Sequence, residues 1–197
     1  MVAVTLPDSP GPRNVQWELV DFGGIVPGAL GGPDQRVNRL GNRWRATVEM
    51  PVLTAKQARE WSAALVRGVR LGVLWEIVQP GFSPGVPGRP LVAGASQTGW
   101  ELDADTFTPG YVWRPGQFIS VLIGTQRYIY QFAESGRVET DGTATLPIEP
   151  ALRVSPGDGD TIEVVRPVMQ GLVAAPAWAY DVDKLARGFS FTITETR

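Results

Sequence analysis

Alternation of apolar and polar residues is clearest between residues 43 and 50. Trp44, Ala46, Val48 and Met50 occupy one set of alternate positions, and arginine, threonine or glutamate occupies the other. Because successive side chains of a strand point to opposite faces, this period of two predicts a strand with one buried face. A pairing shift of one residue would bury two arginines, so the pattern also fixes the register.

Similar patterns predict further strands along the chain. They cover residues 15–22, 69–78, 99–102, 117–123, 127–132, 143–148, 161–165 and 189–193. Gly124-Thr125-Gln126 and Asp141-Gly142 are turn signals between successive strands. The 23 glycines and 17 prolines are spread over the whole length. That distribution is typical of many short strands joined by tight turns.

One segment has the features of a helix, and it begins after Thr54. Thr54 and Gln57 fit a capping box, in which each side chain accepts a hydrogen bond from the backbone N–H of the other residue. Trp61 and Leu65 follow at helical spacing and are expected to pack on the sheet. Gly68 is placed to end the helix in a left-handed conformation.

Two glycine- and proline-rich segments predict loops. Residues 23–41 predict one long loop, either a functional loop lying against a partner or a mobile hairpin tip. Residues 79–90, with four prolines, mark a boundary between two modules. The first 14 residues, also proline-rich, predict an extended arm. The last strand, residues 189–193, is expected to pair with the sheet that holds Trp44 and Trp75.

These elements predict an all-β protein, mainly β with one α-helix. The first module, residues 1–90 plus 168–197, is expected to be split-barrel or sandwich-like and to form the assembly surface. The second module, residues 91–167, is expected to be a small inserted β-barrel or sandwich. A chain of 197 residues is long enough for such cores.

Composition narrows the chemistry. The chain has no histidine and no cysteine, which excludes Ser-His-Asp and Cys-His catalysis, thiolate zinc sites and disulfides. A pair of carboxylates would suffice for a glycosidase, but no phosphate-binding loop or nucleophile motif is present. We therefore predict no enzymatic activity and assign no catalytic, metal-binding or cofactor-binding residues. Asp103 and Asp105 suit a calcium loop only with further oxygen ligands, and an ordinary acidic turn is favoured.

Charge and hydropathy limit the partners. A net charge of −2 is unlike the basic surface of nucleic-acid-binding proteins, so no sequence-specific nucleic-acid partner is predicted. No window approaches the roughly 18 consecutive apolar residues that cross a bilayer, and the amino terminus does not resemble a secretory signal. We expect a soluble protein made in a cytoplasm, without membrane insertion.

Aromatic residues suggest a second type of function. Tyr128, Tyr130 and Phe132 share one face of a predicted strand, which suits either sugar or base stacking or packing inside a barrel. Seven tryptophans on a β scaffold also suit carbohydrate binding. Most of them lie on predicted core faces. If the chain binds a glycan, the contact is expected to be made by an exposed Trp100 or Trp113.

The order of several short strings resembles a known family. RWRATVEMPVLT precedes the capped helix, PGQFISV and TATLPIEPALR lie in the second module, and GFSFTITE closes the chain. This layout resembles the distal tail proteins and related minor tail proteins of long-tailed, siphophage-like bacteriophages. The resemblance covers most of the chain from Trp17 onwards. The chain is short for this group and has no large receptor-binding insertion.

The resemblance implies a structural protein of the virion. It implies a homohexameric ring around a DNA channel at the phage tail tip, assembled in the host cytoplasm. It also implies contacts with the tail tube protein on one side and with a hub protein of the baseplate or tip on the other. The alternative function is a carbohydrate-binding β module that recognises host surface glycans.

Overall fold

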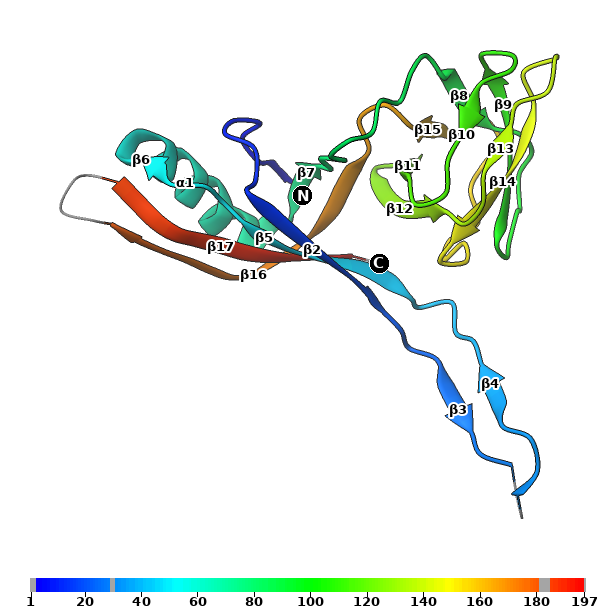
Figure 1. Cartoon of the computed structure of the whole chain (residues 1–197), viewed down its shortest axis with the longest axis horizontal. Coiled ribbons are helices and arrows are strands. Elements are labelled where there is room, and N and C mark those ends of the chain that lie inside the picture. The colour runs from blue at the N-terminus through cyan, green and yellow to red at the C-terminus, as the bar shows by residue number, and fades with distance from the viewer. Residues whose placement is uncertain (1–2, 29–30, 181–184, 197) are drawn as a thin grey trace.

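The computed structural model describes residues 3–28, 31–180 and 185–196. Within this part of the chain, 17 strands accompany a single helix. Most strands belong to a seven-stranded sheet or to a closed six-stranded barrel, and a narrow two-stranded arm projects from the sheet (Figure 1). The predicted class, mainly β with one helix and a small barrel, is confirmed.

The seven-stranded sheet combines the two ends of the chain. Its order is β1 (Val4–Thr5), β7 (Val73–Glu76), β16 (Val168–Tyr180), β17 (Leu185–Glu195), β5 (Arg43–Glu49) and β2 (Asn14–Val20), while β6 (Leu53–Thr54) pairs with β17. Among the described strands of this sheet, only β1 and β7 pair in parallel. Phe191 pairs with Val48 and Ile193 with Ala46. The expected pairing of the last strand with the Trp44 sheet is therefore confirmed.

Strand β5 follows its sequence pattern closely. Trp44, Ala46 and Val48 are buried, and the intervening side chains are partly exposed. On the polar face, the hydroxyl groups of Thr47 and Thr192 lie 3.3 Å apart. The sheet thus has one apolar face, which forms the core, and one face lined by threonine and arginine side chains.

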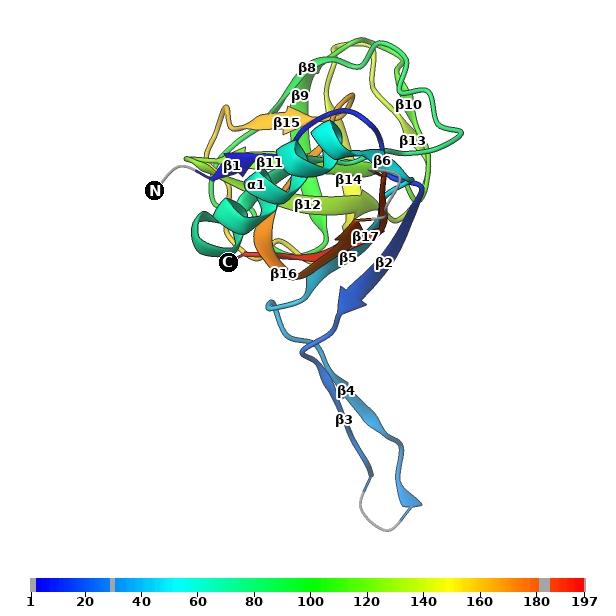
Figure 2. The ribbon, with the colours of Figure 1, turned by 90° about the vertical axis from the view of Figure 1, so that its left-hand side faces the viewer.

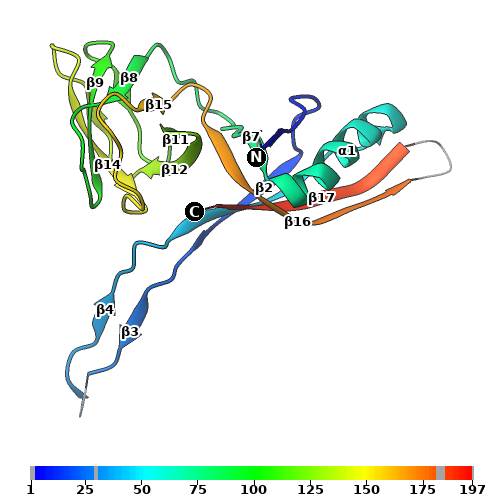
Figure 3. The same cartoon turned by 180° about the vertical axis from the view of Figure 1, so that it is seen from behind.

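Helix α1 (Ala55–Leu71) covers the apolar face of the sheet, as Figures 1 and 3 show. The capping box of Thr54 and Gln57 is present as predicted. The predicted end of the helix is wrong, because Gly68 lies inside it and the cap is Gly72, with a φ of 78°. A β-carbon on Gly68 would lie 2.3 Å from Cγ1 of Val73. Gly68 is therefore needed for close helix–sheet packing rather than for termination.

The barrel contains only strands from the middle of the chain. They are β8 (Gly88–Val92), β9 (Glu101–Phe107), β11 (Phe118–Ile123), β12 (Gln126–Phe132), β14 (Ala144–Glu149) and β15 (Thr161–Glu163), closed in the order β11-β12-β14-β9-β8-β15. The short strands β10 (Val112–Trp113) and β13 (Gly136–Arg137) pair separately. Tyr128, Tyr130 and Phe132 are buried in the barrel core. Core packing is therefore the correct interpretation of this aromatic row.

The segment predicted as one long loop contains a β-hairpin. Strands β3 (Gly24–Val26) and β4 (Gln35–Val37) pair antiparallel and form the projecting arm seen in Figures 1 and 2. The prediction of one long loop is therefore wrong at residues 24–26 and 35–37, which form strands, whereas the alternative of a hairpin agrees with their pairing. Strands β3 and β4 have three residues each and lie in a glycine-rich segment, so the sequence shows no apolar alternation from which the hairpin could be recognised.

Aromatic side chains join the sheet to the barrel. Phe118 of β11 lies in the sheet core, with its ring centroid 4.5 Å from Trp17 and 5.2 Å from Trp44. Gln79, in the connection between β7 and β8, accepts from the N–H of Phe118 at 2.7 Å. Ile129 of the barrel also belongs to this cluster. The two bodies therefore share one continuous apolar contact.

Candidate functional sites

The arm exposes apolar side chains that no other part of the described chain covers. Ile25 is 63% exposed, Val26 52%, Val37 37% and Leu40 58%. An isolated two-stranded hairpin is marginally stable in water at best, because it cannot build a core of its own. Exposed apolar side chains on such a projection are suited to a protein–protein contact.

The root of the arm is held by polar and aromatic contacts. Arg36 forms an ion pair with Asp21, and the N–H of Phe22 donates to Oδ1 of Asn42 at 2.7 Å. The guanidinium of Arg43 lies 4.9 Å from the centroid of the Phe22 ring. Hydrogen bonding from the Gly23 N–H lowers the pKa of the Asp21 carboxyl, and Asn42 and Arg36 act in the same direction. These contacts direct the arm away from the body as an extension of β2 and β5.

A buried ion pair fastens the end of β17 to the barrel. The carboxylate of Glu195 pairs with Arg153 and accepts from the N–H groups of Ile129 at 2.7 Å and Trp44 at 3.2 Å. The guanidinium of Arg153 also lies 5.1 Å from the centroid of the Tyr128 ring. Burial raises the pKa of the Glu195 carboxyl, whereas Arg153 and the two N–H groups oppose that shift. One side chain thus connects β5, β12 and the segment after β14.

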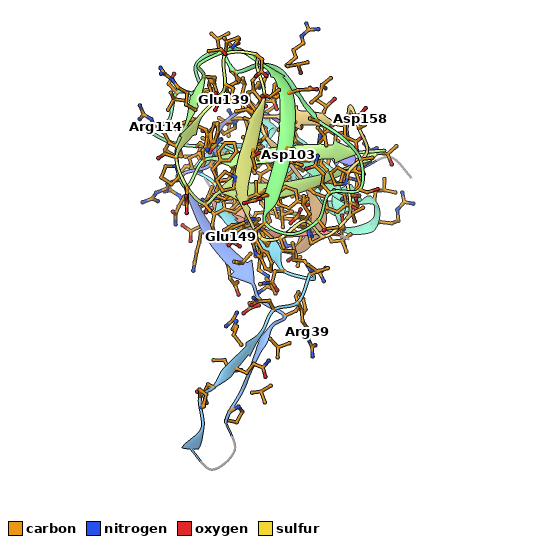
Figure 4. The ribbon with its side chains drawn as sticks, turned by 90° about the vertical axis from the view of Figure 1, so that its right-hand side faces the viewer. Arg39, Asp103, Arg114, Glu139, Glu149 and Asp158 are labelled. Atoms are coloured by element: carbon orange, nitrogen blue, oxygen red, sulfur yellow. The ribbon has the colours of Figure 1, made fainter. Side chains whose placement is uncertain are left out.

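A hollow of about 410 Å³ lies between the root of the arm and the barrel. Its wall on the arm side includes Asn38 and Arg39, and its wall on the barrel side includes Trp100 and Glu149. In Figure 4, Glu149 lies at the end of the barrel nearest the arm, and Arg39 lies near the root of the arm. The remaining lining residues are Leu19, Asp21, Arg36, Asn42, Pro150 and Ala151.

The polar groups of this hollow are only partly used within the chain. Arg39 and Glu149 make no side-chain hydrogen bond or ion pair with the residues that the structure describes. Burial raises the pKa of the Glu149 carboxyl. Trp100 is 46% exposed. The hollow therefore combines a half-exposed indole with free hydrogen-bonding groups, a combination that suits a polar ligand with one apolar face.

The two tryptophans predicted to meet a glycan differ in their environment. Trp100 is exposed as expected, but Trp113 is only 4% exposed, so its prediction as a contact residue is wrong. The Trp113 ring packs 5.8 Å from that of Phe132. Gly136 makes this packing possible, since a β-carbon there would lie 2.1 Å from the indole.

The acidic pair of the second module does not form a turn. Asp103 and Asp105 lie within strand β9, and the hydroxyl of Thr145 donates to Asp103 at 2.6 Å. The turn prediction failed because the alternating apolar residues of β9 continue beyond Leu102. Across the described residues, no group of three or more acidic side chains is arranged to hold a metal ion.

No helix in the described part of the chain is long and apolar enough to cross a membrane.

Comparison of the sequence with models of known protein families and with curated proteins finds no match. The function is therefore inferred from the arm, from the hollow, and from the contact between sheet and barrel around Phe118 and Glu195, which we call the junction.

Proposed function

We propose that this chain is a structural component of a bacteriophage tail tip. In this proposal it is a distal-tail-like protein whose copies form a homohexameric ring around the DNA channel. The ring joins the tail tube protein to the hub of the baseplate or tip, and it is assembled in the host cytoplasm. The layout of the sequence motivates this proposal, and the projecting arm is the observation that carries it.

The arm supports self-association in which the arm of one copy contacts the body, meaning the sheet and barrel, of the next copy. Each copy carries one projection and one body, and repetition of an arm-to-body contact generates a closed ring when the rotation between copies is suitable. Strand β2 lies at the edge of the sheet and offers backbone groups for pairing with a neighbouring chain. Both features suit assembly, and neither requires a catalytic residue.

The role of the arm in oligomer formation can be tested by introducing one charged side chain. Ile25→Asp places a carboxylate on the most exposed of the large apolar side chains described in the arm, and burying it in a subunit contact is strongly unfavourable. The wild-type chain is expected to form oligomers, measured by native mass spectrometry and light scattering over a range of concentrations. Ile25→Asp is expected to remain monomeric and folded, with an unchanged circular dichroism spectrum, because the side chain of Ile25 is 63% exposed within one copy. Its melting temperature should equal that of wild type at concentrations where wild type is also monomeric, since association stabilises the folded state.

A matched variant provides the control. Val86 is 77% exposed and lies between β7 and β8, outside the arm, so Val86→Asp should preserve the oligomer. A wild-type protein that stays monomeric at every concentration would contradict the proposal. So would an oligomer that is unaffected by Ile25→Asp.

A further inference from the structure

The hollow at Trp100 has features that assembly does not require. We propose that it binds a neutral oligosaccharide, with one pyranose ring stacked on the indole of Trp100. The volume of about 410 Å³ lies in the usual range of small-ligand sites, about 300–1,000 Å³. This proposal rests on the hollow alone and does not depend on the tail-tip function.

Trp100 is the most exposed of the seven tryptophans and therefore offers its ring face for stacking. Trp100 is 46% exposed, whereas the other six tryptophans, all within the described residues, are buried or half-buried. Five of those six pack against other aromatic rings in the sheet core, namely Trp17, Trp44, Trp61, Trp75 and Trp178, and Trp113 packs on Phe132 in the barrel. A single exposed tryptophan is not unusual on a protein surface. Trp100 differs from an ordinary exposed tryptophan because it lines a hollow together with the unpaired side chains of Arg39 and Glu149.

Sugar chemistry matches both parts of the site. A pyranose presents C–H groups on one face, which pack against an aromatic ring, and hydroxyl groups at its edge, which need donors and acceptors. Arg39 supplies donors and Glu149 supplies acceptors. The NH2 group of Asn38 supplies further donors, whereas its Oδ1 already accepts from Nε of Arg36 at 3.4 Å. These side chains come from opposite walls, so a ring lying on Trp100 has polar partners on both sides.

The charges of the hollow favour a neutral ligand over a nucleic acid. The acidic side chains Asp21 and Glu149 balance the basic side chains Arg36 and Arg39, and Asp21 is already paired with Arg36. Single-stranded nucleic acids also stack on aromatic rings, but their sites combine the ring with a groove of net positive charge. That groove is lacking among the lining residues.

The proposal can be tested by titration calorimetry with defined probes. Maltotriose, laminaritriose, cellotriose and chitotriose represent neutral oligosaccharides, and a short oligothymidylate represents nucleic acid. We expect at least one of the four sugars to bind the full-length protein. Trp100→Ala should weaken that binding about tenfold or more, by analogy with loss of a stacked ring, and Asn38→Ala should weaken it less.

A control and a second readout separate this proposal from the tail-tip function. Tyr180 is 52% exposed on β16, so Tyr180→Ala removes an exposed aromatic ring elsewhere and should leave sugar binding unchanged. Native mass spectrometry should show the same oligomer for wild type and Trp100→Ala. Absence of binding to all four sugars, binding that survives Trp100→Ala, or preferential binding of oligothymidylate would each overturn the proposal, whatever the oligomeric state.

Discussion

Replacing Glu195 with alanine tests how the sheet and the barrel are held together. The side chain of Glu195 is completely buried and that of its partner Arg153 is 6% exposed. Glu195→Ala leaves the guanidinium without its counter-charge and removes the acceptor of the N–H groups of Ile129 and Trp44. The variant therefore removes the buried ion pair with Arg153 together with the hydrogen bonds that join β17 to β12 and to β5.

The expected cost follows from these losses. Removing one partner of a buried ion pair costs about 3–5 kcal/mol, because an uncompensated charge remains. Each backbone N–H without an acceptor costs about 1–3 kcal/mol, and these costs are not additive. We expect the free energy of unfolding to fall by about 4–6 kcal/mol, a large share of the roughly 5–15 kcal/mol typical of a folded domain.

Urea unfolding followed by tryptophan fluorescence and by circular dichroism measures this loss. The matched control is Glu18→Ala, which removes an exposed ion pair with Arg45, 3.1 Å long and with Glu18 56% exposed. An exposed pair contributes about 0–1 kcal/mol, so this variant should unfold almost like wild type. If Glu195→Ala costs no more than Glu18→Ala, the junction argument is refuted.

Two further substitutions test the core of the sheet. Trp44→Ala should cost roughly 3–5 kcal/mol by leaving a cavity, measured by urea unfolding, and an unchanged melting temperature would mean that Trp44 does not fill the aromatic cluster with Trp17 and Phe118. Gly68→Ala should cost about 1–2 kcal/mol, because overpacking against Val73 outweighs the gain in helix propensity. The double variant Gly68→Ala/Val73→Ala removes that clash, so a double-mutant cycle with no coupling would contradict the packing argument.

Local patterns predicted the elements whose signals are strong and close in sequence. The alternation around Trp44 and the capping box at Thr54 depend on neighbouring residues alone, and both are confirmed. The end of α1 was mistaken because Gly68 and Gly72 both suit a helix terminus. Only the approach of Val73 shows that Gly68 is a packing residue.

The longest of the described strands, β16, was not predicted. Met169, Gly171 and Val173 share its buried face, but the middle one of these is glycine and the exposed Leu172 beside it is apolar, so the sequence shows no clear alternation. That glycine is required, since a β-carbon at Gly171 would lie 2.5 Å from the carbonyl oxygen of Thr194. The requirement for glycine arises from the close approach of β17, so the residues next to Gly171 in the sequence do not indicate it.

The hollow was predictable only in part. Exposure of Trp100 followed from its place outside the predicted core faces, and this expectation is confirmed. Asn38 and Arg39 were not recognised as its neighbours, because they lie some sixty residues earlier, at the root of an arm that was expected to be a loop. Sites formed between distant segments need the fold before they can be seen.

The most direct test of the proposed assembly is electron microscopy of the purified chain, with Ile25→Asp prepared in parallel. The account predicts closed six-membered rings with a central channel for wild type and separate monomers for Ile25→Asp. Wild-type particles that are all monomeric, or rings that form equally well with the aspartate in the arm, would contradict it.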